Sequence, residues 1–231
     1  MEQLDQIAAI LALTMGAAWA SGINLYAAIF MLGFMGMTGN MELPPGLEVL
    51  ANPIVMLAAG AMYVVEFFAD KIPGVDSGWD SIHTFIRIPA GAMLAAGAVG
   101  EVDPAVAVAA GILGGGLTAV THATKAGTRV LVNTSPEPFS NWAVSIAEDV
   151  AVIGGLWTAL NHPLLFLIGL AVFILLLIWF LPKLWRGIKG LFRRIGRLFD
   201  RDVKSDIEQV AESSPAPSEA VDKKREETPP D

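Results

Sequence analysis

One stretch near the N-terminus of the sequence carries almost no charge. Residues 6–65 contain only two charged side chains, Glu42 and Glu48. Soluble domains contain charged residues more often, at about 25% of their composition. Over this whole chain the charged fraction is 16%, and 54% of the residues are hydrophobic. These properties predict a protein that crosses a lipid bilayer several times.

Six segments of the sequence are long and apolar enough to cross a bilayer. A spanning helix needs about 20 mostly apolar residues, because it must cross about 30 Å of hydrocarbon. Short loops with proline, glycine and asparagine separate the segments, so we predict an all-α fold, a polytopic membrane bundle of about six transmembrane helices. The first segment is long enough to tilt or to break near Gly22. The six segments are residues 6–37, 52–70, 80–100, 104–133, 140–160 and 163–181.

Lysine and arginine are confined to one side of this predicted bundle. Among the short loops, only those near Lys71 and Arg129 carry or adjoin a positive charge. The segment that follows residue 182 is strongly basic. Because positively charged loops stay in the cytoplasm, we expect both termini to be cytoplasmic.

The transmembrane part, residues 1–182, contains a weak internal repeat. The segment ASGINLYAA (20–28) resembles KAGTRVLVN (125–133), which aligns Asn24 with Arg129, and Glu66 then corresponds to Glu148. Each half, about 1–101 and 102–182, would hold three spans. Halves with an odd number of spans have opposite orientations, so we predict two inverted three-helix repeats with a site at their interface.

Beyond the last apolar segment the composition changes. Residues 183–201 place apolar side chains three or four apart and basic side chains on the other face, as in an amphipathic helix at a membrane surface. Residues 202–231 are rich in Ser, Pro, Glu and Lys, and we predict a disordered tail there. The side chains expected to bind anionic lipid headgroups are Lys183, Arg186, Lys189, Arg193, Arg194 and Arg197.

Charged side chains inside the predicted spans need partners. An ionisable group at the bilayer centre costs at least about 2.5–3.5 kcal/mol on insertion scales. Residues three or four apart share one face of a helix, as do Glu66 and Asp70. The same spacing joins Asp80, His83 and Arg87. The second and third helices therefore each carry a polar stripe.

The fourth helix carries a similar stripe, and the fifth helix adds carboxylates. We predict that Glu66 pairs with Arg87 and that Glu148 pairs with Arg129 or Lys125. The residues that we predict to bind a substrate or an ion are Asn24, Glu66, His83, Arg87, His122, Lys125, Arg129, Glu148 and Asp149.

The turn KIPGVDSG (71–78) connects the second and third predicted helices. Proline followed by glycine is typical of a turn at the surface. We therefore expect Asp76, and with it Lys71 and Asp80, to be loop charges in water.

A polar cavity among the second, third, fourth and fifth helices suits a small transporter or channel, and this is the predicted function. The cations suit an anionic or phosphate-bearing solute, whereas the carboxylates suit protons or cations. A non-transporting membrane scaffold or assembly factor is the alternative, and an intramembrane enzyme that modifies lipids is a third. The scaffold would act through the basic helix and the tail. The buried charges could then form a dry salt-bridge network that only fixes the helix register.

No local motif of an enzyme or a metal centre accompanies these charges. His83 and His122 could ligate a metal with nearby carboxylates, but no HExxH spacing is present and the chain has no cysteine. We therefore expect no catalytic residue, no metal, no cofactor and no nucleic-acid partner. The expected partner is the lipid bilayer, and the oligomeric state stays open, a homo-oligomer included.

Four blocks of the sequence resemble a bacterial family of integral membrane proteins that is catalogued only as a domain of unknown function. They are LPPGLEVLANP, ADKIPGVDSGWDSIHTFIRIPAGAM, KAGTRVLVNTSPEP and SNWAVSIAEDV, within residues 10–160. The resemblance implies a multi-pass protein of the bacterial inner membrane and brings no substrate, cofactor or catalytic residue. Arginine is common in the family where this chain has Asn24, so the first-helix counterpart of Arg129 is uncharged here.

Overall fold

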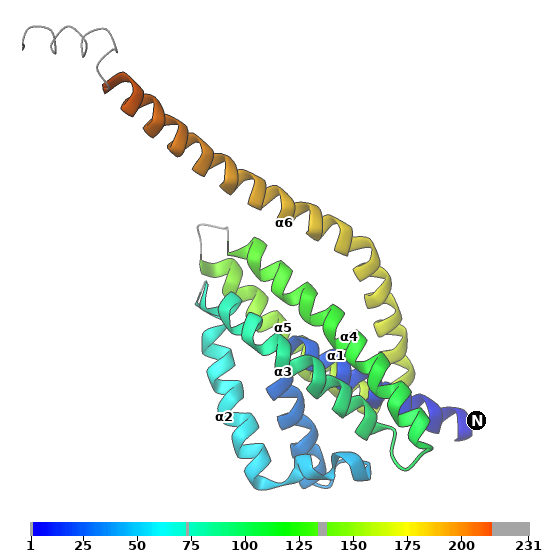
Figure 1. Ribbon diagram of the computed structural model, residues 1–231. Coiled ribbons are helices and arrows are strands. Elements are labelled where there is room, and N and C mark those ends of the chain that lie inside the picture. Colours follow the sequence, from blue (N-terminus) through cyan, green and yellow to red (C-terminus); the bar gives the residue numbers. More distant parts are fainter. Residues whose placement is uncertain (1, 73, 134–137, 214–231) are drawn as a thin grey trace, which may run out of the picture. The chain divides into compact units, whose positions relative to one another are not determined.

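The computed structural model describes residues 2–72, 74–133 and 138–213, with side chains except at 138, 191, 192 and 194–213. The described residues form helices and no strand, which confirms the all-α prediction (Figure 1). The chain divides into two compact units, Met1–Trp185 and Arg186–Asp231. The elements are α1 (Glu2–Met37), η1 (Pro45–Ala51), α2 (Pro53–Ala69), α3 (Val75–Ala98), α4 (Pro104–Val132), α5 (Pro138–Asn161) and α6 (Pro163–Ser213).

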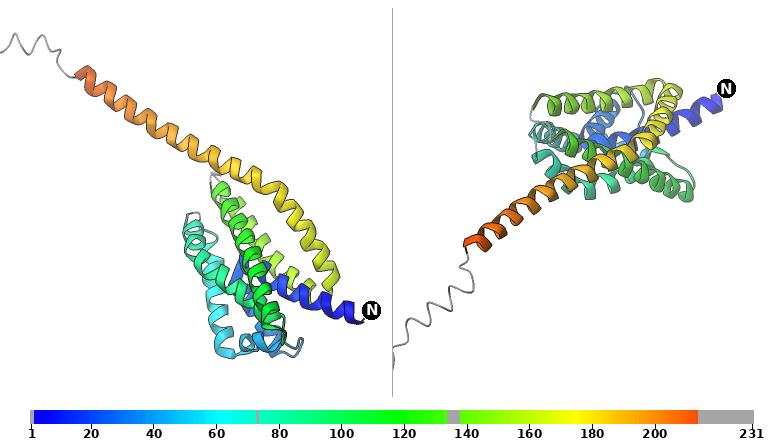
Figure 2. Two further views of the ribbon diagram at one scale, coloured as in Figure 1. Left: turned by 45° about the vertical axis from the view of Figure 1, so that its right-hand side comes forward. Right: turned by 90° about the horizontal axis from the view of Figure 1, so that it is seen from above.

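Helix α1 lies at the centre of the first unit and contacts α2, α3, α4 and α5. Helices α3 and α4 lie side by side along most of their length (Figures 1 and 2). The first half of α1 packs in an apolar core with α5 and α6, where the Trp19 ring meets the Phe166 and Phe173 rings edge-on at centroid distances of 6.0 Å. The second half of α1 packs against α2, and polar side chains gather near the junction of the two halves.

Glycine allows α1, α3 and α4 to approach closely beside that junction. A Cβ atom at Gly22 would collide with the Thr121 hydroxyl and would lie 2.7 Å from the Thr118 carbonyl oxygen. A Cβ atom at Gly91 would collide with the Thr118 side chain. Small residues at such crossings are the usual means of close helix packing in lipid.

Helix α1 is interrupted at Asn24, where φ is −145° and ψ is 98°. The break that we predicted near Gly22 therefore occurs two residues later. The Asn24 side chain explains the position, because its Oδ1 accepts the backbone N–H of Ala27 at 3.0 Å and so caps the second half of the helix.

Helix α3 begins at Val75, five residues before the predicted start at Asp80. The prediction that Asp76 and Asp80 are loop charges in water is wrong, because both side chains are buried. Asp76 Oδ1 accepts the N–H groups of Gly74 (2.9 Å) and Ser77 (2.5 Å), and Asn133 Nδ2 donates to the same carboxylate. Asp76 therefore stabilises the first turn of α3 and ties it to the end of α4, whereas Lys71 is partly exposed.

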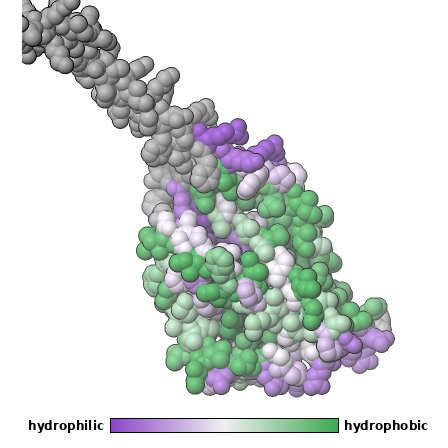
Figure 3. Space-filling model, viewed as in Figure 1, coloured by the Kyte–Doolittle hydropathy of each residue, from purple (hydrophilic) through white to green (hydrophobic). Residues whose placement is uncertain are grey.

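Four helices of the described chain are long and apolar enough to cross a membrane: α1, α4, α5 and the Pro163–Gly190 part of α6. The pair η1 and α2, bent by 69°, makes a fifth if it is one broken span. Apolar residues cover much of the surface seen in Figure 3, and hydrophilic residues gather at its upper and lower ends. These apolar helices suggest insertion into a membrane, although the predicted number of six spans is larger than this count.

Helix α6 continues through Pro182 to Ser213, so the predicted sixth span and the predicted amphipathic segment belong to one continuous helix. Proline is tolerated in long apolar helices when the freed carbonyl finds another partner. Residues 202–213 of the predicted disordered tail are also helical. Their apolar positions 203, 207 and 210 follow a helical spacing. Residues 214–231 of that tail lie outside the described residues.

Candidate functional site

Seven charged side chains from α2, α3, α4 and α5 contact one another inside the first unit, and we refer to them as the charged cluster. Six of them are almost completely buried, and the Glu148 side chain retains 16% exposure. Charged groups are seldom buried unless they are paired. The cluster consists of the carboxylates Glu66, Asp70, Asp80 and Glu148 and the cations Arg87, Lys125 and Arg129.

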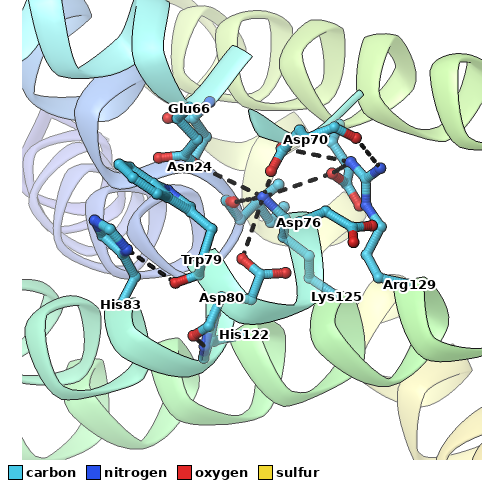
Figure 4. A network of polar contacts seen from close by, with 12 residues as sticks. Asn24, Glu66, Asp70, Asp76, Trp79, Asp80, His83, His122, Lys125 and Arg129 are labelled. Atoms are coloured by element: carbon cyan, nitrogen blue, oxygen red, sulfur yellow. Dashed lines mark hydrogen bonds and ion pairs between the residues drawn. The ribbon is translucent and has the colours of Figure 1, made fainter. Parts of the chain in front are cut away.

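Lys125 lies at the centre of the charged cluster (Figure 4). Its Nζ is 3.0 Å from Asp70 Oδ2 and 3.4 Å from Glu66 Oε1. Asp80 Oδ1 and Glu148 Oε2 each lie 3.7 Å from the same nitrogen. One ammonium group therefore contacts all four carboxylates of the cluster.

The two arginines flank Lys125. Arg87 Nη2 lies 2.5 Å from Glu66 Oε1, and its Nη1 lies 3.2 Å from Asp80 Oδ1. Arg129 Nη2 lies 2.6 Å from Glu148 Oε2 and 3.4 Å from Asp70 Oδ2. The predicted pairs of Glu66 with Arg87, and of Glu148 with Arg129 and Lys125, are thus confirmed as contacts.

The break in α1 contributes backbone groups to the cluster. The Ile23 carbonyl accepts hydrogen bonds from Arg87 Nη1 (3.2 Å) and Lys125 Nζ (3.0 Å). The Ala27 N–H, which would bond this carbonyl in a regular helix, bonds the Asn24 side chain instead. Broken helices that expose backbone groups to ions are a recurring feature of transporter sites.

Asp149 lies beside the charged cluster and is held by the same break. Asn24 Nδ2 donates to Asp149 Oδ1 at 3.0 Å, and the Asp149 residue is 8% exposed. Within the described part of the chain Asp149 forms no ion pair with a lysine or arginine. The Asn24–Asp149 pair thus joins α1 to α5 through a buried hydrogen bond.

Negative charge exceeds positive charge in this region. Five carboxylates, counting Asp149 with the four of the cluster, surround three cations. Within the described residues, Glu66 Oε2, Asp70 Oδ1 and Asp149 Oδ2 are buried without a hydrogen-bond partner. Buried carboxylates without compensation take up a proton or bind a cation, because an isolated buried charge is costly.

The two predicted histidines occupy different environments. His122 bonds Arg87 Nη1 through Nδ1 at 3.1 Å and Thr84 Oγ1 through Nε2 at 2.7 Å, so it adjoins the charged cluster. His83 stacks on the Trp79 ring at a centroid distance of 4.2 Å, and its Nε2 lies 3.1 Å from the Tyr26 hydroxyl. Unlike the other predicted site residues, His83 therefore makes no described contact with a charged side chain.

The predicted site omitted two members of the charged cluster, Asp70 and Asp80, and one residue that contacts it, Asn141. Asp70 and Asp80 follow the same helical spacing as Glu66 and Arg87, so that signal was present in the sequence. Asn141 accepts a bond from Arg129 Nη1 at 2.5 Å through Oδ1. No spacing in the sequence identified it, because the contact forms only when α5 packs beside the end of α4.

The predicted lipid-headgroup residues lie on α6. Lys183, Arg186, Lys189 and Arg193 are exposed, and the Lys183 ammonium lies 3.0 Å from the centroid of the Trp179 ring. The side chains of Arg194 and Arg197 lie outside the described set. In the described chain no three His, Asp or Glu residues are arranged to hold a metal ion.

The two largest described cavities are not lined by the charged cluster. One, of about 580 Å³, lies between the first half of α1 and the C-terminal end of α5, beside Glu42 and Asn161. The other, of about 530 Å³, is an apolar groove between the second half of α1, α2 and α5. The cluster side chains instead pack directly against one another.

Comparison with known proteins identifies a family for most of the chain. Residues 11–183 match the family described as Domain of unknown function (DUF4126). This range includes the charged cluster, the break at Asn24 and all four sequence blocks on which the resemblance rested. No curated protein and no solved structure matches the chain. The chain belongs to the DUF4126 family.

Proposed function

We propose that this protein is a small membrane transporter or channel for protons or cations, and that the charged cluster with Asn24 and Asp149 is its site. The observation that carries the proposal is the excess of buried carboxylates, five around three cations, with buried oxygens that lack a described partner. Intramembrane carboxylates with incomplete compensation are typical of proton and cation pathways.

The charge distribution favours a positively charged substrate over an anion. Each of the three cations already contacts at least two carboxylates within 4 Å. An anion would have to displace one of those carboxylates and would meet the remaining ones. A proton or a small cation instead reduces the excess negative charge.

The proposal includes six spans, with α3 as the one that the hydropathy count omits. The buried side chains Asp80 and Arg87 of α3 face the bundle, whereas Phe85 and Met93 are largely exposed. A helix with charges inside and large apolar side chains outside suits a lipid environment. The inner membrane of a bacterium, with both termini in the cytoplasm, remains the proposed location.

The proposed inverted repeat fits the position of the site. Glu66 and Glu148, which correspond in the two halves, both contact Lys125 Nζ. Asn24 and Arg129, the other corresponding pair, lie on opposite sides of the same ammonium group (Figure 4). A site at the meeting point of two halves is the arrangement expected of inverted-repeat transporters.

An ion-flux assay tests the proposal. The full chain is placed in liposomes, and the movement of H⁺, Na⁺ and K⁺ is followed with fluorescent indicators under an imposed gradient. We expect flux of at least one of these ions, and a large reduction in Glu148→Gln, which alters the most accessible carboxylate of the cluster. Glu101→Gln, in the exposed loop between α3 and α4, is the matched control. Absence of flux for all three ions would contradict the proposal.

The alternative function, a non-transporting scaffold, is favoured by one observation. The cluster is densely paired, and neither of the two largest described cavities reaches it. In that case α6 and its exposed basic residues, which we propose bind anionic lipid headgroups, would carry the activity. Truncation after Leu181 distinguishes the two, because ion flux should survive the truncation and a scaffold phenotype should not.

A further inference from the structure

The apolar groove between α1, α2 and α5 has the dimensions of a ligand site. Its volume is about 530 Å³, within the range of about 300–1,000 Å³ that is usual for small-molecule pockets. Phe30 and Phe34 of α1, Tyr63 and Val64 of α2, and Ile153 of α5 line it. The Tyr63 hydroxyl is the main polar group among these lining side chains.

Beyond one end of the groove, Lys71, two residues after the end of α2, contacts α5. Its Nζ lies 3.5 Å from Ser145 Oγ. Tyr63 precedes Lys71 by eight residues and Ile153 follows Ser145 by eight, and both line the groove. Helices α2 and α5 are therefore antiparallel, and the groove lies about 12 Å from the Lys71–Ser145 contact, at 1.5 Å per residue.

Asp149 lies between the groove and the Lys71–Ser145 contact. It precedes Ile153 by one helical turn, about 6 Å along α5. Its Oδ1 accepts from Asn24, while its buried Oδ2 has no described hydrogen-bond partner. The nine-tenths buried carboxylate of Asp149 thus lies one helical turn beyond the apolar groove.

We propose that this groove binds a lipophilic amine, with its alkyl chain between α1, α2 and α5 and its ammonium group at Asp149 Oδ2. The chain would occupy the apolar lining, and the ammonium would supply the ion pair that Asp149 lacks among the described residues. A lipophilic anion is disfavoured by Asp149 and by the neighbouring carboxylates of the charged cluster. The inference goes beyond the proposed function, since binding requires no transport.

A binding experiment on the full chain in lipid nanodiscs tests the inference. Binding of dodecylammonium and of neutral dodecanol is measured by titration calorimetry, with empty nanodiscs subtracted. We expect saturable binding of the amine and weaker binding of the alcohol. Asp149→Asn should weaken amine binding by about tenfold to a hundredfold, as for the loss of a charge-assisted hydrogen bond, with little effect on the alcohol.

A second pair of variants tests the groove without altering the carboxylate. Ile153→Trp fills the groove and should reduce binding of both ligands, whereas Ile146→Trp should not. Ile146 is a matched control, because it lies on the same helix and is 49% exposed against 47% for Ile153, but does not line the groove.

Two results would overturn the inference. The first is equal binding of the amine and the alcohol. The second is the same affinity in Ile153→Trp and Ile146→Trp, which is expected if the ligands only dissolve in bulk lipid. If Asp149→Asn does not fold, two comparisons still test the inference. One is Ile153→Trp against Ile146→Trp, and the other is binding of the amine against dodecanol in the unchanged protein. Amine binding without ion flux would contradict only the proposed function.

Discussion

Helices α3 and α6 distribute their apolar side chains in different ways. The Pro163–Trp185 part of α6 is apolar along nearly its whole length, and most of its large side chains, such as Leu175 at 67%, are exposed. On α3 the charged side chains Asp76, Asp80 and Arg87 are buried, whereas Phe85 is 83% exposed. Both helices thus present an apolar exterior, but only α3 has a charged interior.

The difference shows why mean hydropathy recognises α6 and omits α3. Hydropathy averages all faces of a helix, so the buried charges of α3 lower its value although they do not face outward. Charges inside a membrane bundle are stable only if other helices supply partners. Helices α2 and α4 supply those partners here, through Glu66 and Lys125, so α3 depends on its neighbours in a way that α6 does not.

The largest effect should follow removal of an α3 charge. Arg87→Met leaves Glu66 and Asp80 without one of their cations and should lower the free energy of unfolding by about 3–5 kcal/mol, the usual cost of an unpaired buried charge. Lys183→Met on α6 removes an exposed cation and should cost little. Thermal unfolding in lipid bicelles measures both. Equal losses in the two variants would remove the distinction between the helices.

A charge placed on the exposed face of α3 or of α6 should lower stability by a similar amount. Phe85→Lys on α3 and Leu175→Lys on α6 each place a charge on an exposed apolar face. If both faces contact lipid, each variant should lose about 2.5–3.5 kcal/mol of stability. The same unfolding assay in bicelles tests this, and a harmless Phe85→Lys beside a damaging Leu175→Lys would place α3 in water.

Alanine substitutions at glycine should also affect the stability of α3 and α6 differently, with a smaller effect. Gly91→Ala on α3 forces a methyl group against the Thr118 side chain and should cost about 1–3 kcal/mol, as overpacking does. Gly169→Ala on α6 meets open space and should be neutral or slightly stabilising. Denaturant midpoints measured side by side provide the comparison, and a tolerated Gly91→Ala would mean that α3 and α4 are farther apart than described.

The smallest expected effect concerns α6 alone. Trp179→Leu removes the ring beneath the Lys183 ammonium and should cost about 0.5–1 kcal/mol, typical of an exposed cation–π contact. The variant Lys183→Met in the Trp179→Leu background should add almost nothing. A double-mutant cycle of unfolding free energies measures the coupling, and a coupling near zero would show that the contact does not stabilise α6.

The ion-pair partners in the charged cluster were easier to predict from the sequence than the burial of its residues or the position of the helix break. Helical spacing and charge were enough to pair Glu66 with Arg87 and Glu148 with Arg129. They did not show that Asp80 is buried, because its place next to a Pro-Gly turn is typical of a loop. The break in α1 was predicted near Gly22 but lies at Asn24. Periodicity could not show this, because an asparagine cap depends on local hydrogen bonds.

The beginnings of the helices were easier to predict from the sequence than the end of α6. Apolar length, together with the proline at each helix start, predicted the beginnings of α4 and α6 at Pro104 and Pro163. The same signals did not predict that α6 continues through Pro182, because a proline after an apolar run usually indicates a boundary. Local sequence patterns thus located helices, whereas tertiary contacts determined which charges are buried.

The environment of Phe85 provides the most direct test of whether α3 faces lipid. The chain has no cysteine, so Phe85→Cys, Leu175→Cys and Glu101→Cys each provide a single site for a nitroxide spin label. Collisions of the label with oxygen, which concentrates in lipid, and with a water-soluble nickel chelate are measured in liposomes. If α3 faces lipid as α6 does, the label at position 85 should behave as at 175, with high oxygen and low nickel accessibility. Nickel accessibility at position 85 equal to that at position 101 would contradict it.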